Sequence, residues 1–221
     1  IGIQVLSGSQ SSYAYTADTS EDALLATARA AAAGLRDART AAPVHIPAFR
    51  TVEHARQDAV YFGETTNAQR IELLRSMYAA ASGHSEEIKQ VQCRYLDSDQ
   101  RVWVINSDGL WASTRRPYTR IVVVAVASDG SSTQTGFRGP GFGRGFDVYE
   151  KIDTAALGRE AAEMAVTMLH APECPAGLFP VVIDGGFGGV IFHEACGHSL
   201  EATSVSKGNS EFTGKLGQQI A

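Results

Sequence analysis

Hydrophobic residues recur at helical spacing in three stretches of the chain, at about 21–34, 67–82 and 153–170. Because positions three or four apart share one face of an α-helix, each stretch predicts an amphipathic helix. Capping residues support these ends: Asp18, Thr19 and Ser20 are possible caps before the first stretch, and Gly34 and Gly83 follow the first two. The pattern therefore predicts three helices.

Between the second and third predicted helices the apolar period changes to two. Val91, Cys93 and Tyr95 alternate with polar residues, and turn-forming residues occur at 97–100, 106–109 and 128–131. Alternation bounded by turns is typical of β-strands, so this region predicts an antiparallel meander of four or five strands. Residues 121–127 are apolar on both faces, which indicates a central strand.

Shorter segments complete the expected architecture. We expect short β-structure within 1–16, a strand at 180–184, and loops at 37–62 and 136–147. The predicted fold class is α+β: an antiparallel β-meander flanked by helices, followed by a strand–glycine-rich turn–helix.

Composition narrows the functional classes. The 221 residues are 44% hydrophobic, which excludes a mostly disordered chain, and the net charge of -5 excludes a globally basic nucleic-acid footprint. The three cysteines lie far apart, which favours a reducing, cytoplasmic compartment over a disulfide framework. The longest apolar run, at 121–127, is too short for a membrane span. The chain starts without Met or a recognisable leader, and we expect it to be part of a longer protein.

Residues 185–201, GGFGGVIFHEACGHSLE, carry the candidate chemistry. His193 and Glu194 are adjacent, and His198 follows His193 by five positions. Imidazole nitrogens bind zinc, and an adjacent glutamate can act as general base. Positions i and i+5 lie about 140° apart on an ideal α-helix. Both rings therefore meet one ion only if the helix contains a π-bulge, which Gly197 would ease. The apolar surroundings predict that His193 lies inside the fold.

The same residues also have simpler interpretations. The two histidines can equally be a packed or capping pair that binds no metal. Glu201, three residues after His198, is interpreted as an orienting partner of that imidazole or as helix-end packing, rather than as a direct ligand. Glu211 is, with Glu201, the other local carboxylate that could supply an oxygen as a third metal ligand. Cys196 is interpreted as a small packing residue.

Four glycines precede the motif: Gly185, Gly186, Gly188 and Gly189. Without a Cβ they allow close backbone approach, so an extended peptide substrate could lie beside this turn. A tight connection between strand and helix is an equally good interpretation. The cluster lacks the G-K-[ST] ending of a phosphate-binding P-loop.

Residues 180–221 resemble the signature region of the TldD/PmbA family, whose members have been described as modulators of DNA gyrase. The H-E-x-x-x-H motif is the hallmark of its TldD-type zinc metallopeptidases, and PmbA-type (TldE-type) members lack it. The resemblance implies that His193 and His198 bind Zn²⁺, that Glu194 is catalytic, and that a cysteine from a C-terminal half is the third ligand. We therefore expect an N-terminal α+β domain at 1–175. Residues 176–221 are expected to begin the metallopeptidase domain, with its C-terminal half absent from this chain.

The resemblance also implies a substrate and partners. The expected activity is zinc-dependent hydrolysis of unfolded peptides or small peptide precursors. The expected assembly is a homodimer, or a heterodimer with a TldE/PmbA-like subunit, that encloses a chamber.

Two other classes of function stay open. One is a non-catalytic interaction module, or a gyrase-modulating protein, in which the histidines are structural. The other is binding of single-stranded nucleic acid by the loop at 136–147, where Arg138 and Arg144 lie among phenylalanines. Two arginines in an acidic chain make nucleic-acid binding the weakest of these interpretations.

Overall fold

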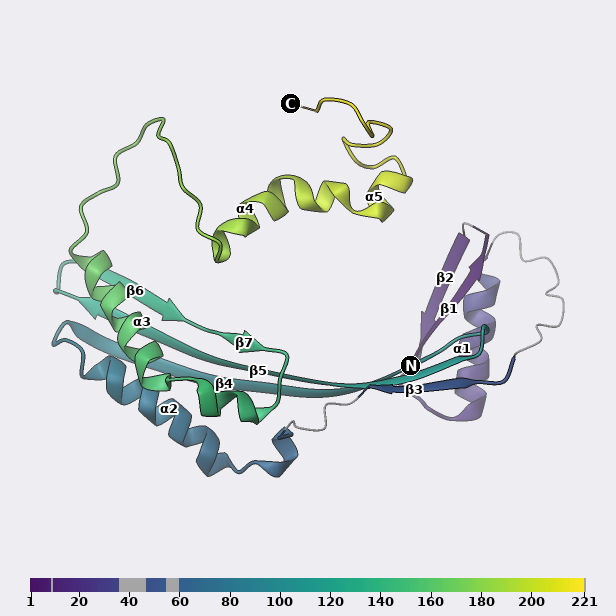
Figure 1. Cartoon of the computed structure of the whole chain (residues 1–221), viewed down its shortest axis with the longest axis horizontal. Helices are drawn as coiled ribbons and strands as arrows, with labels where there is room; N and C mark the ends of the chain where they lie inside the picture. Colours follow the sequence, from purple (N-terminus) through teal and green to yellow (C-terminus); the bar gives the residue numbers. More distant parts are fainter. Residues whose placement is uncertain (9, 36–46, 55–59, 221) are drawn as a thin grey trace. The chain divides into compact units, whose positions relative to one another are not determined.

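A computed structural model describes residues 1–8, 10–35, 47–54 and 60–220 of the chain (Figure 1). The chain divides into two compact units, Ile1–Ala171 and Pro172–Ala221, and each is described by itself. Among the described residues, the first unit holds all the strands and the three long helices. The second holds the short helical turns that carry the histidine motif. The predicted α+β class is confirmed.

A five-stranded sheet is the framework of the first unit. Two long strands, β4 (Ile88–Ile105) and β5 (Leu110–Ser128), form an antiparallel hairpin (Figure 1). Strand β5 is central, as predicted, because β3 (Arg50–His54), β6 (Thr133–Arg138) and β7 (Gly141–Phe142) also pair with it. The region predicted as a loop at 136–147 therefore contributes the end of β6, all of β7 and the start of the 3-10 helix η2 (Phe146–Lys151).

The turn predicted at 97–100 is wrong. Strand β4 continues through these residues, which pair with β5 in register, for example Asp99 with Pro117. Arg115 of β5 holds Asp99 with a two-pronged ion pair, and its guanidinium carbon lies 3.3 Å from the centre of the Tyr61 ring. Cross-strand contacts thus keep a polar, turn-like sequence extended. The meander consequently has fewer and longer strands than its turn residues predict.

The expected loop at 37–62 is wrong at β3. This strand pairs in parallel with the start of β5, with Arg50 opposite Leu110. The Phe49 ring packs edge-on against the Trp111 ring, with the ring centres 5.6 Å apart. Such pairing depends on a partner about 60 residues away, which local periodicity does not reveal. Residues 37–46 and 55–59 of the predicted loop lie outside the described residues.

The three predicted helices are confirmed to within about a residue. They are α1 (Glu21–Ala33), α2 (Asn67–Ser82) and α3 (Thr154–Leu169). Each has a side-chain N-cap: Ser20, Thr66 and Asp153 accept hydrogen bonds from the backbone of the first turn. Polar side chains therefore satisfy amide groups that the helix itself leaves without a partner.

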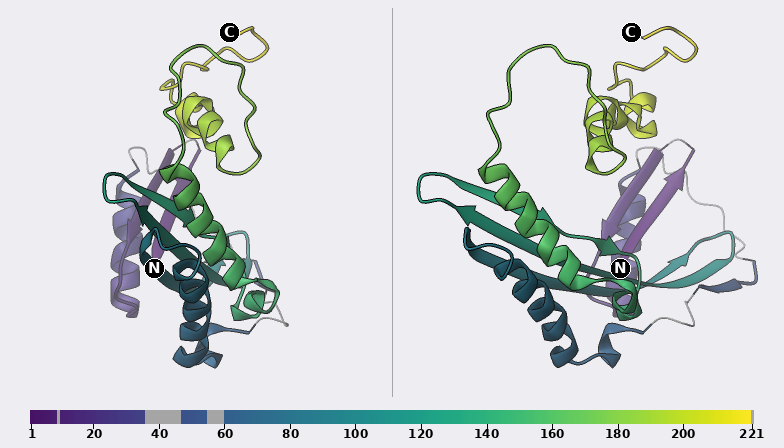
Figure 2. Two further views of the ribbon diagram at one scale, coloured as in Figure 1. Left: turned by 90° about the vertical axis from the view of Figure 1, so that its left-hand side faces the viewer. Right: turned by 60° about the vertical axis from the view of Figure 1, so that its left-hand side comes forward.

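Helices α2 and α3 lie side by side and bury one face of the sheet (Figure 2). That face presents the alternate β5 residues Ile121, Val123, Ala125 and Ala127, which are all fully buried. Gly136 of β6 lets α3 approach closely, because a Cβ there would lie 1.9 Å from the Ala161 carbonyl oxygen. The helix-covered face is the core of the first unit.

The short β-structure predicted within 1–16 is present, and its two strands form a separate hairpin. Strands β1 (Gly2–Ser7) and β2 (Gln10–Tyr15) pair in antiparallel fashion, and α1 packs against both. Gly8 has a φ of 58°, a conformation that glycine adopts without strain.

The second unit contains no strand among its described residues, so the strand predicted at 180–184 is wrong. A strand needs a partner for its backbone groups, and none of the described residues pairs with this segment. Its side chains are open to solvent, and Val182 is fully exposed. No described residue of the second unit is buried.

The second unit is instead a series of short turns. They are η3 (Phe187–Gly189), α4 (Val190–Phe192), η4 (His193–Gly197), η5 (His198–Leu200) and α5 (Ala202–Ser206). Within the described part of the chain, no helix combines the length and apolarity needed to cross a bilayer.

Candidate metal centre

The histidine motif lies on a π-helical turn. Residues His193–Gly197 form η4, and the backbone N–H of His198 donates to the His193 carbonyl oxygen, five residues earlier. The π-bulge that a shared metal site would require at this spacing is therefore present. The wider turn rotates the sixth residue back over the first.

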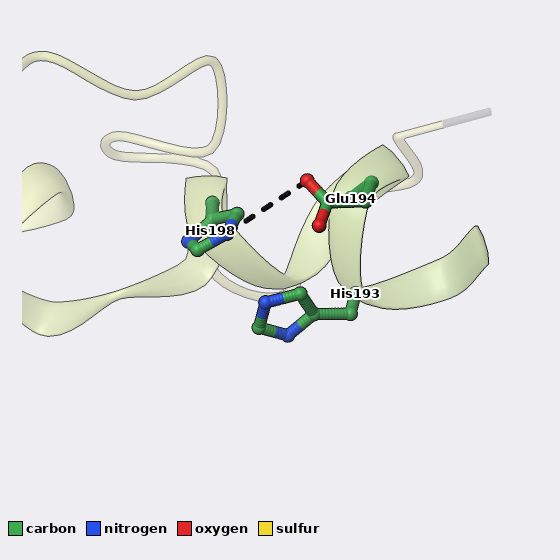
Figure 3. A group of neighbouring side chains, drawn as sticks. All are labelled: His193, Glu194 and His198. Atoms are coloured by element: carbon green, nitrogen blue, oxygen red, sulfur yellow. Dashed lines mark ion pairs between the residues drawn. The ribbon is translucent and has the colours of Figure 1, made fainter. Parts of the chain in front are cut away.

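This turn brings the two imidazoles together (Figure 3). The ring centres of His193 and His198 lie 4.3 Å apart, with an angle of 65° between the ring planes. Together with Glu194, they offer ligand atoms that all lie within 4.8 Å of one another. Among the described residues this is the one group of histidine, cysteine and acidic side chains close enough to hold a metal ion.

Glu194 faces the same cluster. Its Oε2 lies 3.8 Å from Nε2 of His198, and Figure 3 shows the carboxylate directed toward that ring. The Glu194 and His198 side chains are 66% and 55% exposed, and His193 is exposed too. The expectation that His193 lies inside the fold is therefore wrong within the described residues, since nothing there covers the turn.

The second ring nitrogen of His198, Nδ1, is hydrogen-bonded to Glu201. Nδ1 of His198 lies 2.8 Å from Oε1 of Glu201. This hydrogen bond is the main cause that raises the pKa of His198 above its usual value, and the charges of Glu201 and Glu194 add to it. The two ring nitrogens thus face different carboxylates.

Two other candidates lie outside the cluster. The Cys196 thiol lies on the π-turn but donates to the Phe192 carbonyl oxygen, at 3.2 Å. Glu211 is exposed and makes no hydrogen bond or ion pair with any described residue. Neither residue joins the group of close ligand atoms.

Gly197 is not required by the geometry of the turn. Its φ of -58° and ψ of -50° are ordinary helical angles. A Cβ there would make a normal contact with Nδ1 of His193, at 3.5 Å. The wide turn therefore does not depend on glycine at this position.

The four glycines before the motif have different surroundings. A Cβ on Gly185 or Gly189 would meet no atom within 4 Å, whereas one on Gly188 would lie 2.4 Å from Cγ2 of Ile183. A side chain at 188 would therefore displace the Ile183 side chain, whereas the backbone beside Gly185 and Gly189 is open.

An apolar hollow borders Glu194. It has a volume of about 550 Å³ and is lined by Gly188, Val190, Ile191, Glu194 and Ala195. Val190 and Glu194 are four residues apart, as are Ile191 and Ala195, so helical spacing places them on one face. That spacing is the sequence signal that could have indicated the hollow.

Two family models match this chain. Residues 61–169 match the central domain of the PmbA/TldA metallopeptidases, and residues 176–221 match their C-terminal domain. The chain belongs to the PmbA/TldD family. The resemblance of its histidine motif to this family is confirmed.

Named relatives of similar sequence are metalloproteases, which agrees with the family assignment. A metalloprotease from Methanothermobacter thermautotrophicus is 36% identical over 154 residues, which are 70% of this chain and 34% of that protein. A metalloprotease TldD homolog from Haemophilus influenzae is 30% identical over 227 residues, which span this whole chain and 47% of that protein. The chain thus spans no more than about half the length of these relatives.

Solved structures match this chain as well. A candidate modulator of DNA gyrase from Thermotoga maritima matches with a TM-score of 0.72 at 18% identity, over 99% of this chain and 48% of that one. One from Bacteroides thetaiotaomicron also has a TM-score of 0.72, at 15% identity, over 100% of this chain and 51% of that one. At these identities the matches show a shared fold.

Proposed function

We propose that this chain is the part of a TldD-type, zinc-dependent metallopeptidase that carries the catalytic motif. The observation that supports the proposal is the π-turn, which brings His193, Glu194 and His198 within reach of one ion. The names of the relatives support metallopeptidase chemistry at the family level.

The donor set fits zinc. Zinc in catalytic sites takes three protein ligands, often imidazoles, and keeps a further position for water or substrate. His193 and His198 are the proposed ligands, because their rings converge at 4.3 Å. The third ligand is proposed to be a cysteine from a C-terminal half, as the resemblance to TldD-type members implies. None of the chain's own three cysteines joins the cluster.

When bound, zinc supplies Lewis-acid activation of water and of the scissile carbonyl. Glu194 takes a proton from the attacking water and passes it to the leaving amine as the C–N bond breaks. Oε2 of Glu194 lies 3.8 Å from Nε2 of His198, next to both proposed ligands. This position suits a general base that acts on water at the metal. In this arrangement each histidine would bind the metal as a neutral imidazole, through the lone pair of one ring nitrogen.

The proposed substrates are unfolded peptides or small peptide precursors. The open backbone beside Gly185 and Gly189 offers room for an extended chain next to the motif. Gly186 and Gly188 belong to the same proposed substrate-binding turn. The proposed assembly is a homodimer or a heterodimer with a TldE/PmbA-like subunit, and the proposed location is the cytoplasm.

Elemental analysis of the full-length protein tests the proposal. We expect about one zinc per chain, and loss of that zinc in His193→Ala and His198→Ala. The matched control is His84→Ala, which changes a histidine of the first unit. A folded full-length protein that binds no zinc would instead favour the non-catalytic interaction module.

A further inference from the structure

The two ring nitrogens of His198 have distinct partners. Nδ1 lies 2.8 Å from Oε1 of Glu201, whereas Nε2 lies 3.8 Å from Oε2 of Glu194. A carboxylate accepts hydrogen bonds and cannot donate them, so Nδ1 of His198 must carry the proton in the Glu201 hydrogen bond. The neutral ring then keeps its lone pair on Nε2, the nitrogen nearer to Glu194.

We infer that Glu201 is a positioning residue that holds His198 in the tautomer whose Nε2 binds the metal. The inference rests on the proposed function. A hydrogen bond from the second nitrogen of a ligating imidazole to a carboxylate fixes the tautomer and the orientation of the ring, and raises its basicity as a ligand. The three-residue spacing of Glu201 from His198 supplies that bond locally, without help from the rest of the fold.

The two histidines differ in this respect. Among the described residues, His193 makes no hydrogen bond through either ring nitrogen, and its ring packs against that of His198 at an angle of 65°. His198 is therefore the imidazole that the second unit pre-orients. Glu201 should matter for binding of the metal even before any substrate is present.

Within the described part of the chain, the Glu201 side chain makes no hydrogen bond or ion pair other than that with His198. Its backbone carbonyl accepts the hydrogen bond from Val205 that begins α5, but its side chain makes no capping hydrogen bond. Replacing the side chain therefore leaves the start of α5 intact. A change in metal binding can then be attributed to the lost contact with His198.

The test measures zinc affinity by competition with a chelator, on full-length protein. We expect Glu201→Ala to weaken zinc binding by about 10–100-fold, the range found for such outer partners. Glu201→Gln keeps an acceptor oxygen without the charge and should recover part of the affinity. Glu211→Gln, a change at the exposed carboxylate outside the cluster, should bind zinc as the parent does.

A second measurement reports the tautomer directly. The ¹⁵N shifts of labelled histidine in the metal-free protein, above the pH at which His198 titrates, should show the proton on Nδ1 of His198. Glu201→Ala should move that proton toward Nε2, and Glu201→Gln should restore it. A residue that merely stabilised the unit would not change this signal.

The outcomes separate the two proposals. If His193→Ala and His198→Ala lose zinc but Glu201→Ala keeps the parental affinity and tautomer, the role of Glu201 is overturned and the proposed function stands. If the histidine variants bind zinc as the parent does, the proposed function fails, and the role of Glu201 fails with it.

Discussion

Helices α3 and α2 pack closely where Gly158 meets Met77: a Cβ on Gly158 would lie 2.3 Å from the Met77 carbonyl oxygen. Both residues are buried, and the Cβ of Ala80 would lie 3.2 Å from the added carbon. The obstacle is backbone, which cannot rotate away as a flexible side chain can. The packing of the two helices over the sheet therefore depends on glycine at this crossing.

Gly158→Ala should destabilise the first unit. We expect the free energy of unfolding to fall by about 1–3 kcal/mol, because overpacking forces the helices apart, although alanine favours the helix itself. Urea unfolding followed by circular dichroism measures the change. Gly143→Ala is the control, since a Cβ there would meet no atom within 4 Å. Parental stability in Gly158→Ala would contradict the close crossing.

Gly197→Ala should leave the metal site intact. The backbone angles of Gly197 are helical, and the added carbon would make only an ordinary contact with His193. We expect full-length Gly197→Ala to bind zinc as tightly as the parent, measured by chelator competition. Loss of zinc would mean that the π-turn needs the freedom of glycine after all.

Glu194→Gln should separate catalysis from metal binding. The amide keeps the size of the side chain but cannot accept a proton, so peptide hydrolysis should fall by about 10²–10⁴-fold. The zinc content should stay near that of the parent, because the two imidazoles remain. Rates on an unfolded peptide and elemental analysis provide the two readouts. An active Glu194→Gln enzyme would exclude Glu194 as the general base.

Tyr149→Phe should remove a buried hydrogen bond. The Tyr149 hydroxyl lies 2.7 Å from Oγ1 of Thr119, in the core on the helix-covered face of the sheet. We expect a loss of about 1 kcal/mol in the free energy of unfolding at neutral pH, a usual net value for such a bond. Thr119 keeps its hydrogen bond to the Leu96 carbonyl oxygen, which limits the cost. Tyr78→Phe, at an exposed position of α2, is the control.

The same tyrosine predicts a pH dependence. Burial raises the pKa of Tyr149 from 10.0 to about 12, so the folded state holds this proton more tightly than the unfolded state does. The stabilising contribution is complete below pH 10 and is lost as the pH rises toward 12. Urea unfolding from pH 9 upward should therefore show parental stability approaching that of Tyr149→Phe. A constant difference between the two proteins across this range would contradict the raised pKa.

The candidate site was largely open to prediction because its geometry is local. On a regular helix the five-residue spacing from His193 to His198 would keep the two rings apart, so a shared site required the π-turn that the structure contains. Glu201 lies within one further turn, and its contact with His198 follows from a spacing of three. The exposure of the motif was not predicted, since burial depends on what the rest of the fold places over it.

The sequence by itself determined the helices, the class of fold and the position of the chemistry. Helical spacing and caps such as Thr66 act within a few residues, so α2 could be placed from its own sequence. Only the tertiary structure decided that β3 joins β5 in parallel, and that Asp99 lies within a continuous strand held by Arg115. It also left 180–184 without a strand partner among the described residues, despite the apolar sequence of this segment. The physical reason is the sequence separation of the hydrogen-bonding partners. A strand pairs with residues that can lie far along the chain, whereas the backbone groups of helices and turns form hydrogen bonds with neighbouring residues.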